Sequence, residues 1–141
     1  MSTMSEEKIQ VDIITPTSKV FSGEVESLIA PGIEGYFGVL PRHAPYVVAM
    51  QIGEIKLKSN DDAKLQHFAT SGGFAEVLPN KITVLADSAE PASQIDVGRA
   101  EKAVTRAQKR IDEGRKNWDI DRAQAALSRA FNRMAIAKKN M

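Results

Sequence analysis

The chain up to about residue 90 alternates between apolar and polar positions in short runs, which is typical of half-buried β-strands. Turn residues such as Pro31-Gly32, Gly72-Gly73 and Pro79-Asn80 separate the runs. Short strands with a turn about every 8–12 residues predict a β-sandwich or barrel. The expected strands are residues 10–14, 20–30, 38–40, 46–51, 54–58, 65–70, 73–78 and 81–86.

The apolar pattern changes near Pro91 to alternating spacings of three and four, which predict amphipathic helices. Ser93 is expected to cap the first helix and Asp119 the second. The break at residues 114–118 is short enough to make the helices antiparallel. The chain therefore divides into residues 1–90 and residues 91–141. The apolar positions are Val97, Ala100, Val104, Ala107 and Ile111, then Ile120, Ala123, Leu127, Ala130, Met134 and Ala137.

Many of these helical positions are alanine, which lets helices approach closely but buries little apolar area. Each methyl contributes on the order of 0.8 kcal/mol, whereas ordering one residue costs roughly 1–2 kcal/mol. Such a hairpin is marginal alone, so we expect it to lean on the sandwich, on a ligand or on another protein. A modest ligand can switch an element of this kind.

Composition excludes several classes of function. The chain has no cysteine and only two histidines, which excludes disulfides and thiolate chemistry and leaves little for a metal site. Its sequence contains no phosphate loop, serine elbow or paired-histidine motif, so we expect no catalytic residues and no metal, and ATP hydrolysis by the chain itself is disfavoured. The polar N-terminus and the lack of an apolar run of about 20 residues favour a cytoplasmic protein.

Arginines on the two expected helices are the sharpest chemical signal. Each helix carries three arginines at spacings of seven and four, which places them on one face. Two such stripes on adjacent helices predict a cleft suited to phosphate groups. The alternatives are two solvated faces or a nucleic-acid surface. The stripes are Arg99, Arg106 and Arg110, and Arg122, Arg129 and Arg133.

Four stretches resemble, in order, motifs of the F-type ATP synthase epsilon subunit of the bacterial, ATP-binding type. Residues 35–45 resemble its Gly-x-x-Gly-x-x-Pro-x-His-x-Pro loop, and Ser71-Gly72-Gly73-Phe74 resembles its Ser-Gly-Gly-Phe strand. Ile95-Asp96-Val97-Gly98-Arg99-Ala100 resembles the Ile/Leu-Asp-x-x-Arg-Ala motif, and Arg129-Ala130-Phe131-Asn132-Arg133 the matching part of the second helix.

The resemblance implies a ten-stranded β-sandwich followed by an antiparallel two-helix hairpin. It implies a non-catalytic rotor subunit of the central stalk, peripheral at the cytoplasmic face of the bacterial plasma membrane. The sandwich would dock on the gamma subunit and the c-subunit ring. The helices would fold down on the sandwich, or extend into the alpha/beta hexamer and inhibit ATP hydrolysis. ATP, with or without magnesium, would be a regulatory ligand of the folded-down form, with no required cofactor and no nucleic-acid partner.

The resemblance also implies roles for individual residues. Ile95 and Asp96 match positions that contact adenine and ribose, with Glu90 near the base and Ala100 lining the pocket. Four arginines match those that face the phosphates: Arg99, Arg106, Arg129 and Arg133. The loop with Tyr36, Arg42 and His43 matches the region that faces the c ring. Two departures are Tyr36, where several relatives carry an acidic residue, and Arg42, where relatives usually have Gly.

Overall fold

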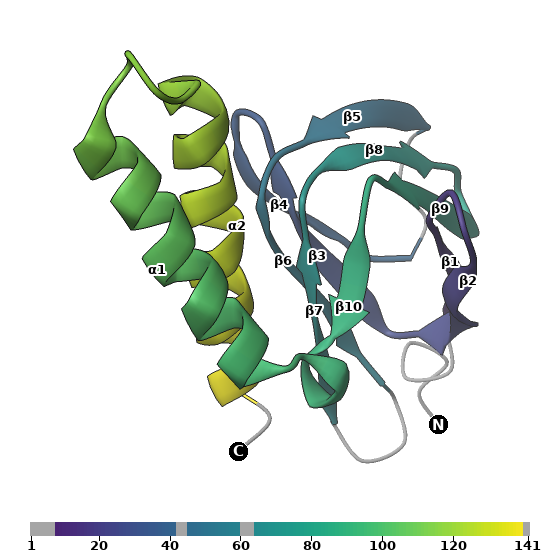
Figure 1. The fold of residues 1–141 in the computed structure, drawn as a ribbon. Helices are drawn as coiled ribbons and strands as arrows, with labels where there is room; N and C mark the ends of the chain where they lie inside the picture. Colours follow the sequence, from purple (N-terminus) through teal and green to yellow (C-terminus); the bar gives the residue numbers. More distant parts are fainter. Residues whose placement is uncertain (1–7, 42–44, 60–63, 140–141) are drawn as a thin grey trace.

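Ten strands form a sandwich and two helices lie against one of its faces (Figure 1). The computed structural model describes residues 8–41, 45–59 and 64–139. The strands are β1 (Ile9–Ile14), β2 (Lys19–Val25), β3 (Ser27–Gly32), β4 (Gly35–Val39), β5 (Tyr46–Met50), β6 (Gly53–Lys58), β7 (Leu65–Thr70), β8 (Gly73–Val77), β9 (Lys81–Ala86) and β10 (Ala89–Pro91). A 3₁₀ turn (Ala92–Gln94) leads to the helices α1 (Val97–Glu113) and α2 (Ile120–Lys138).

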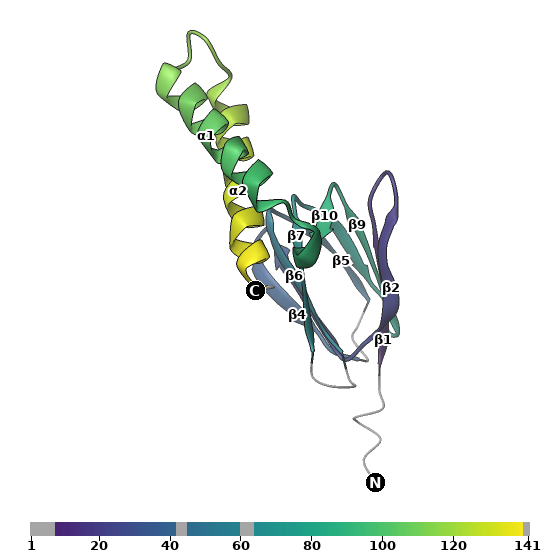
Figure 2. The same ribbon diagram turned by 60° about the horizontal axis from the view of Figure 1, so that its bottom comes forward.

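The strands follow the order β10-β7-β6-β3-β5-β8-β9-β1-β2, and β4 pairs with β3. The two halves of this sheet are linked where Gly32 of β3 pairs with Met50 of β5. Elsewhere β1 runs parallel to β9, while the other ladders are antiparallel. The result is two layers facing each other, with β4 and β6 in the layer beside the helices and β1 and β2 in the far layer (Figure 2).

The core lies between the two layers and is formed by alternate side chains of their strands. In β9, for example, Ile82, Val84 and Ala86 are buried while Lys81 and Leu85 are exposed. This alternation confirms the two-residue period read from the sequence. The largest fully buried side chains of the sandwich are Ile9, Ile13, Leu28, Ile55, Leu57 and Ile82.

The sandwich departs from the predicted strands in three places. The strand expected at residues 38–40 begins three residues earlier and is β4, Gly35–Val39. The expected strand at residues 20–30 is two strands, which separate at Glu26, where the backbone N–H donates to the carbonyl of Lys58. The short strand β10 was not predicted, because Pro91 suggested that the strands had ended. Proline is tolerated there because β10 lies at the edge of the sheet, where a missing N–H donor costs little.

The hairpin begins at a different cap from the one expected. Asp96 caps α1, because its Oδ1 accepts the backbone N–H of Arg99 at 3.0 Å. The prediction of Ser93 is therefore wrong, since Ser93 lies in the 3₁₀ turn. The cap at Asp119 is confirmed, with Oδ1 accepting the N–H of Arg122 at 3.1 Å. Gly114 ends α1 with a φ of 84°, a conformation that favours glycine.

The alanine-rich contact between the helices is present as predicted. Ala100 and Ala107 of α1 are buried, as are Ala123 and Ala130 of α2, whereas Val97 is exposed at the start of α1. Small side chains at these positions let the two helices pack side by side along most of their length (Figure 1). Neither described helix is long and apolar enough to cross a bilayer.

Candidate functional site

The hairpin rests on a row of three residues on the outer face of the sheet. Glu54 of β6 and Glu90 of β10 both pair in register with Ala69 of β7. Directly opposed residues of antiparallel strands point to the same face. The sheet therefore presents two carboxylates on either side of one small apolar residue, and we call Glu54, Ala69 and Glu90 the acidic row.

Helix α2 carries cations that match the acidic row. Arg133 binds Glu90 through both guanidinium branches, with Nε at 2.6 Å from Oε1 and Nη2 at 3.1 Å from Oε2. Lys139, at the C-terminal end of α2, places Nζ 2.6 Å from Oε1 of Glu54. The other oxygen of Glu54 lies 2.5 Å from Nδ1 of His67. Two ion pairs thus connect the hairpin to the sandwich at opposite ends of the row.

An apolar contact and a hydrogen bond complete the docking. Ile136 and Ala137 of α2 are buried in one cluster with Ala69, Ala92 and Ile95. Burying an isoleucine side chain contributes roughly 1.5–3 kcal/mol. The side-chain amide of Asn132 donates to the carbonyl of Gly53 at 2.8 Å. In this structure the hairpin is therefore folded down, with its second helix against the sheet.

Glu54 is charged in this setting. Burial alone would raise the pKa of its carboxyl group, but hydrogen bonds from Lys139 and His67, together with their charges, outweigh burial and lower the pKa below its ordinary value of 4.5. Glu54 is 8% exposed. A buried charge of this kind is stable only while its partners remain in place, so the pair ties the C-terminal end of α2 to β6.

Beside these contacts lies a cavity of about 400 Å³, which is within the range of small-molecule sites. We call it the proximal cavity. The sandwich, α1 and α2 all contribute to its wall, so a ligand inside it would contact all three. Its lining residues are Ala69, Thr70, Ser71, Ser88, Glu90, Ala103, Arg106, Ala126, Arg129, Ala130, Asn132 and Arg133.

Half of the residues predicted to bind ATP line this cavity: Glu90, Arg106, Arg129 and Arg133. Among the described residues, neither Arg106 nor Arg129 forms an ion pair, so both guanidinium groups are available to an anion. The described part of the chain gathers no group of three or more acidic or histidine side chains that could hold a metal ion.

The other four predicted ATP residues lie outside the lining. Asp96 caps α1, and Arg99 is exposed on the first turn of that helix. Ile95 is buried in the contact between hairpin and sandwich, and Ala100 is buried against α2. Arg99 stands two helical turns before Arg106, about 10 Å along the axis. In this structure the Asp96 motif thus shapes the start of the hairpin rather than the cavity wall.

Sequence reasoning missed several residues of the site. Thr70, Ser71, Ser88 and Asn132 also line the cavity. Ser71 and Asn132 lie inside two of the motifs quoted above, so a signal for them was available. The sequence contained no signal for Glu54, because its role depends on Lys139, which is 85 positions away in the chain.

The loop predicted to face the c ring is only partly described. Tyr36 lies within β4, where its hydroxyl accepts the backbone N–H of Glu54 at 3.0 Å. Its ring is more than half exposed. Arg42 and His43 lie outside the described residues.

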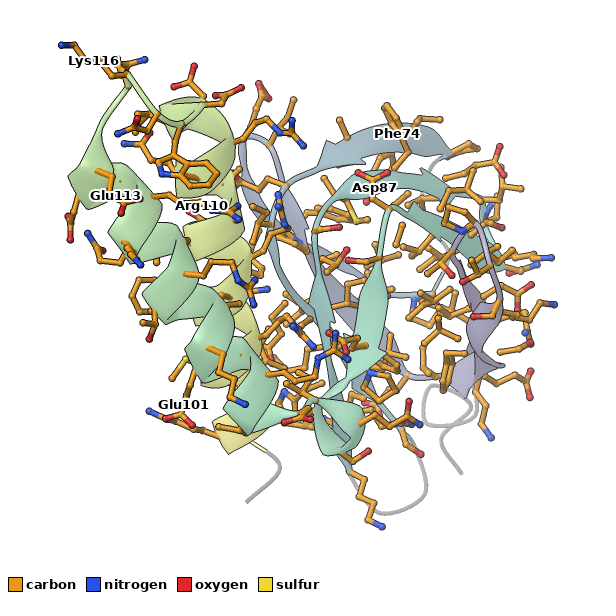
Figure 3. The ribbon with its side chains drawn as sticks, viewed as in Figure 1. Phe74, Asp87, Glu101, Arg110, Glu113 and Lys116 are labelled. Atoms are coloured by element: carbon orange, nitrogen blue, oxygen red, sulfur yellow. The ribbon has the colours of Figure 1, made fainter. Side chains whose placement is uncertain are left out.

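A second surface lies on the outer face of the far layer. Ile14, Leu85, Phe74 and Ala49 are partners in register across β1, β9, β8 and β5, and we call them the apolar row. Phe74 and Leu85 are each more than half exposed. Phe74 points outward on the side away from the hairpin (Figure 3). Exposed apolar side chains in contact across several strands mark an interaction surface.

Two family models together match residues 8–138. The model described as "ATP synthase, Delta/Epsilon chain, beta-sandwich domain" matches residues 8–92. The model described as "ATP synthase, Delta/Epsilon chain, long alpha-helix domain" matches residues 93–138.

Curated relatives agree with these models, and a solved structure shares the fold. The ATP synthase epsilon chain of Nitratidesulfovibrio vulgaris strain DP4 is 48% identical over 93% of this chain and 96% of its own length. The ATP synthase epsilon chain of Syntrophobacter fumaroxidans is 45% identical over 94% of this chain and 98% of its own. A chain from the Euglena gracilis mitochondrial ATP synthase, solved as OSCP/F1/c-ring, has a TM-score of 0.79 at 21% identity, covering 91% of this chain and 80% of that one.

Proposed function

Because the chain belongs to the ATP synthase delta/epsilon chain family, we propose that it is the epsilon subunit of a bacterial F-type ATP synthase. In this role it is a non-catalytic part of the central stalk, at the cytoplasmic face of the plasma membrane. It couples the rotor to the c ring and restrains ATP hydrolysis through its helices. Support comes from relatives named epsilon chain that match along nearly their full length.

The rotor contacts use the surface that the hairpin leaves free. The apolar row is the best candidate for the gamma subunit, because Phe74 and Leu85 would bury apolar area that is now in water. The loop that contains Tyr36, Arg42 and His43 would face the c ring. The apolar row lies on strands other than those of the acidic row, so the gamma contact and the docked hairpin do not compete.

ATP is proposed to bind in the proximal cavity and to hold the hairpin down. One observation carries this proposal: Arg106 of α1, Arg129 and Arg133 of α2, and hydroxyl groups of the sandwich line the same cavity. Guanidinium groups make paired hydrogen bonds to phosphate oxygens, and three of them can share one triphosphate. A ligand with several negative charges therefore binds all three parts of the site together.

Such a ligand favours the folded-down form. If the helices separate and extend toward the alpha/beta hexamer, Arg106 and Arg129 no longer converge, and the sandwich hydroxyls are left behind. Only a difference in affinity between two conformations can shift their populations. ATP would thus release the enzyme from inhibition by keeping the hairpin on the acidic row.

Titration of the purified chain with ATP tests this function. Calorimetry should give saturable binding, and backbone amide shifts should change at Ser71, Ser88, Arg106 and Arg129. Incubation with ATP and magnesium should release no phosphate above background, because the chain is proposed to bind ATP without hydrolysing it. Shifts confined to the apolar row, or no binding at millimolar ATP, would contradict the ATP-responsive part of the proposal.

A further inference from the structure

A second cavity lies between the helices near the tip of the hairpin. It measures about 520 Å³ and is lined by both helices and the turn between them. We call it the distal cavity. Its lining residues are Ala103, Arg106, Ala107, Arg110, Asn117, Trp118, Asp119, Arg122, Ala123, Ala125, Ala126 and Arg129. Since the sandwich contributes no residue, this cavity belongs to the hairpin alone.

The charges of the distal cavity favour an anion. Four arginines line it: Arg106, Arg110, Arg122 and Arg129. Within the described residues none of the four forms an ion pair with a carboxylate. Asp119 is the acidic residue of the lining, and its side chain already accepts the backbone N–H of Arg122 as a helix cap. Like charges gathered around one space repel, and an anion between them relieves that repulsion.

Trp118 fixes one of these arginines in place. The Arg110 guanidinium lies 4.4 Å from the centre of the Trp118 ring, and the indole N–H donates to Glu113 at 2.7 Å. Arg110 lies between the two helices near the hairpin tip, whereas Lys116 points away from the tip into solvent (Figure 3). Stacking uses the flat face of a guanidinium and leaves its N–H edge free for an oxyanion.

The two cavities adjoin each other. Both are lined by Ala103, Arg106, Ala126 and Arg129, so Arg106 and Arg129 stand where the cavities meet. From Arg133 in the proximal cavity to Arg122 in the distal one, α2 rises about 16 Å. Arginines therefore follow each other along a path longer than a triphosphate chain, with small alanine side chains between them.

We propose that the distal cavity is a phosphate site of its own, which extends the proximal cavity into a channel for linear inorganic polyphosphate. A flexible chain of phosphate groups meets each arginine in turn. A peptide would find few apolar or amide partners among the lining residues, and Trp118 is packed on Arg110 instead of standing free to stack on a base. The site shares Arg106 and Arg129 with the proposed ATP site but does not require that ATP binds.

The protein contains its own reporter for this site. Trp118 is the sole tryptophan of the chain, so intrinsic emission reports on the distal cavity. We would titrate the full chain with long-chain polyphosphate, tripolyphosphate and ATP at physiological ionic strength, and follow both emission and heat. Long-chain polyphosphate should change the emission in a saturable way and bind at least about tenfold more tightly than tripolyphosphate, because it reaches more arginines.

Variants separate the two cavities. Arg122 lines only the distal cavity, so Arg122→Gln should weaken the binding of long-chain polyphosphate about tenfold and leave ATP binding unchanged. Arg133 lines only the proximal cavity, so Arg133→Gln should weaken ATP binding and keep the emission response to polyphosphate. Arg115→Gln removes the same charge from the tip but lines neither cavity, so it is the matched control.

Several results would overturn the phosphate site. These are an unchanged emission with every phosphate, an equal loss in Arg115→Gln and Arg122→Gln, or binding of polyglutamate as tight as that of polyphosphate. The last result would show that the arginines accept any polyanion. Polyphosphate binding without ATP binding would support the distal site and contradict the ATP proposal. ATP binding without a polyphosphate response would support the ATP proposal and contradict the distal site.

Discussion

Replacing Arg129 by alanine gives the most direct test of the proposed ATP site. Its guanidinium lines the proximal cavity and has no ion pair in the described structure, so its loss removes a ligand contact without breaking a link between hairpin and sandwich. A hydrogen bond to a charged group contributes about 1.5–3 kcal/mol. Because Arg129 is exposed, solvent screening favours the lower end of that range, or about tenfold in Kd.

Arg133 provides an informative comparison. Its guanidinium is already bound by Glu90 on both branches, so ATP must share it. Arg133→Ala should weaken ATP binding by at least as much as Arg129→Ala, because the Glu90 carboxylate then lines the cavity without its cationic partner and repels an anionic ligand. It should also loosen the docked hairpin without ATP, which Arg129→Ala should not do.

The effect on conformation follows from the change in affinity. At ATP ten times above Kd, binding stabilises the folded-down form by about 1.4 kcal/mol. If Kd rises tenfold, the same ATP concentration contributes only about 0.4 kcal/mol. The intact enzyme carrying Arg129→Ala should therefore remain inhibited at ATP levels that release the wild type.

Calorimetry on the isolated chain and hydrolysis assays on the reassembled enzyme would measure the two effects. Arg115→Gln serves as a control for charge, since Arg115 lines no part of the proximal cavity. An unchanged Kd in Arg129→Ala would refute the reasoning and leave the arginine stripes as solvated surface. A tenfold change in Kd with no change in inhibition would instead separate ATP binding from control of the hairpin.

Three further predictions concern the docked hairpin. A chain that ends after Ala92 should keep a cooperative thermal transition and still bind the gamma subunit, because the sandwich core contains no helix residue; loss of the transition would contradict this. Ile136→Ala should cost about 2–5 kcal/mol of docking, seen as faster amide exchange in α2 with the sandwich strands unchanged. Glu54→Gln should weaken docking at neutral pH. Since the pKa of Glu54 is lowered in the folded protein, its contribution to docking is present above pH 4.5 and is lost as the pH falls, so docking of the wild type should approach that of Glu54→Gln in acid. Lys139→Gln, which removes one partner of Glu54, should resemble Glu54→Gln. Equal acid sensitivity of docking in all three proteins would contradict this role of Glu54.

Most of the fold could be predicted from the sequence, because apolar residues recur at a clear period in both halves of the chain. The two-residue alternation in strands such as β9 and the three-four spacing in the helices follow from burial of one face, and both were confirmed. One miss came from competition between neighbouring residues and another from a contact distant in sequence. Ser93 and Asp96 are both good capping residues, and the 3₁₀ turn that uses residues 92–94 favoured the second. Glu26 divides two strands through a hydrogen bond to Lys58 that no local pattern reveals.

The candidate site was less predictable, because it depends on pairs distant in sequence. Arg106, Arg129 and Arg133 could be proposed from helical spacing, since spacing fixes which side chains share a helix face. Glu54 could not, because its position beneath Lys139 follows from the register of β6 and β7 and from the angle at which α2 crosses them. The distal cavity was equally hidden, since the stacking of Trp118 on Arg110 depends on how the interhelical turn folds back.

The parallel ladder between β1 and β9 has a consequence for how the protein forms. Gln10 of β1 pairs with Lys81 of β9, so this ladder can form only after nearly all of the sandwich strands have been synthesised. Contacts of such long sequence separation slow folding, because loop-closure entropy is lost before they are gained. The helices form through contacts between residues close in sequence, and they dock on a sheet that is already complete. During synthesis on the ribosome we therefore expect the sandwich to close only after β9 has emerged, with the hairpin docking last, so that the element proposed to be regulatory is also the last part to fold.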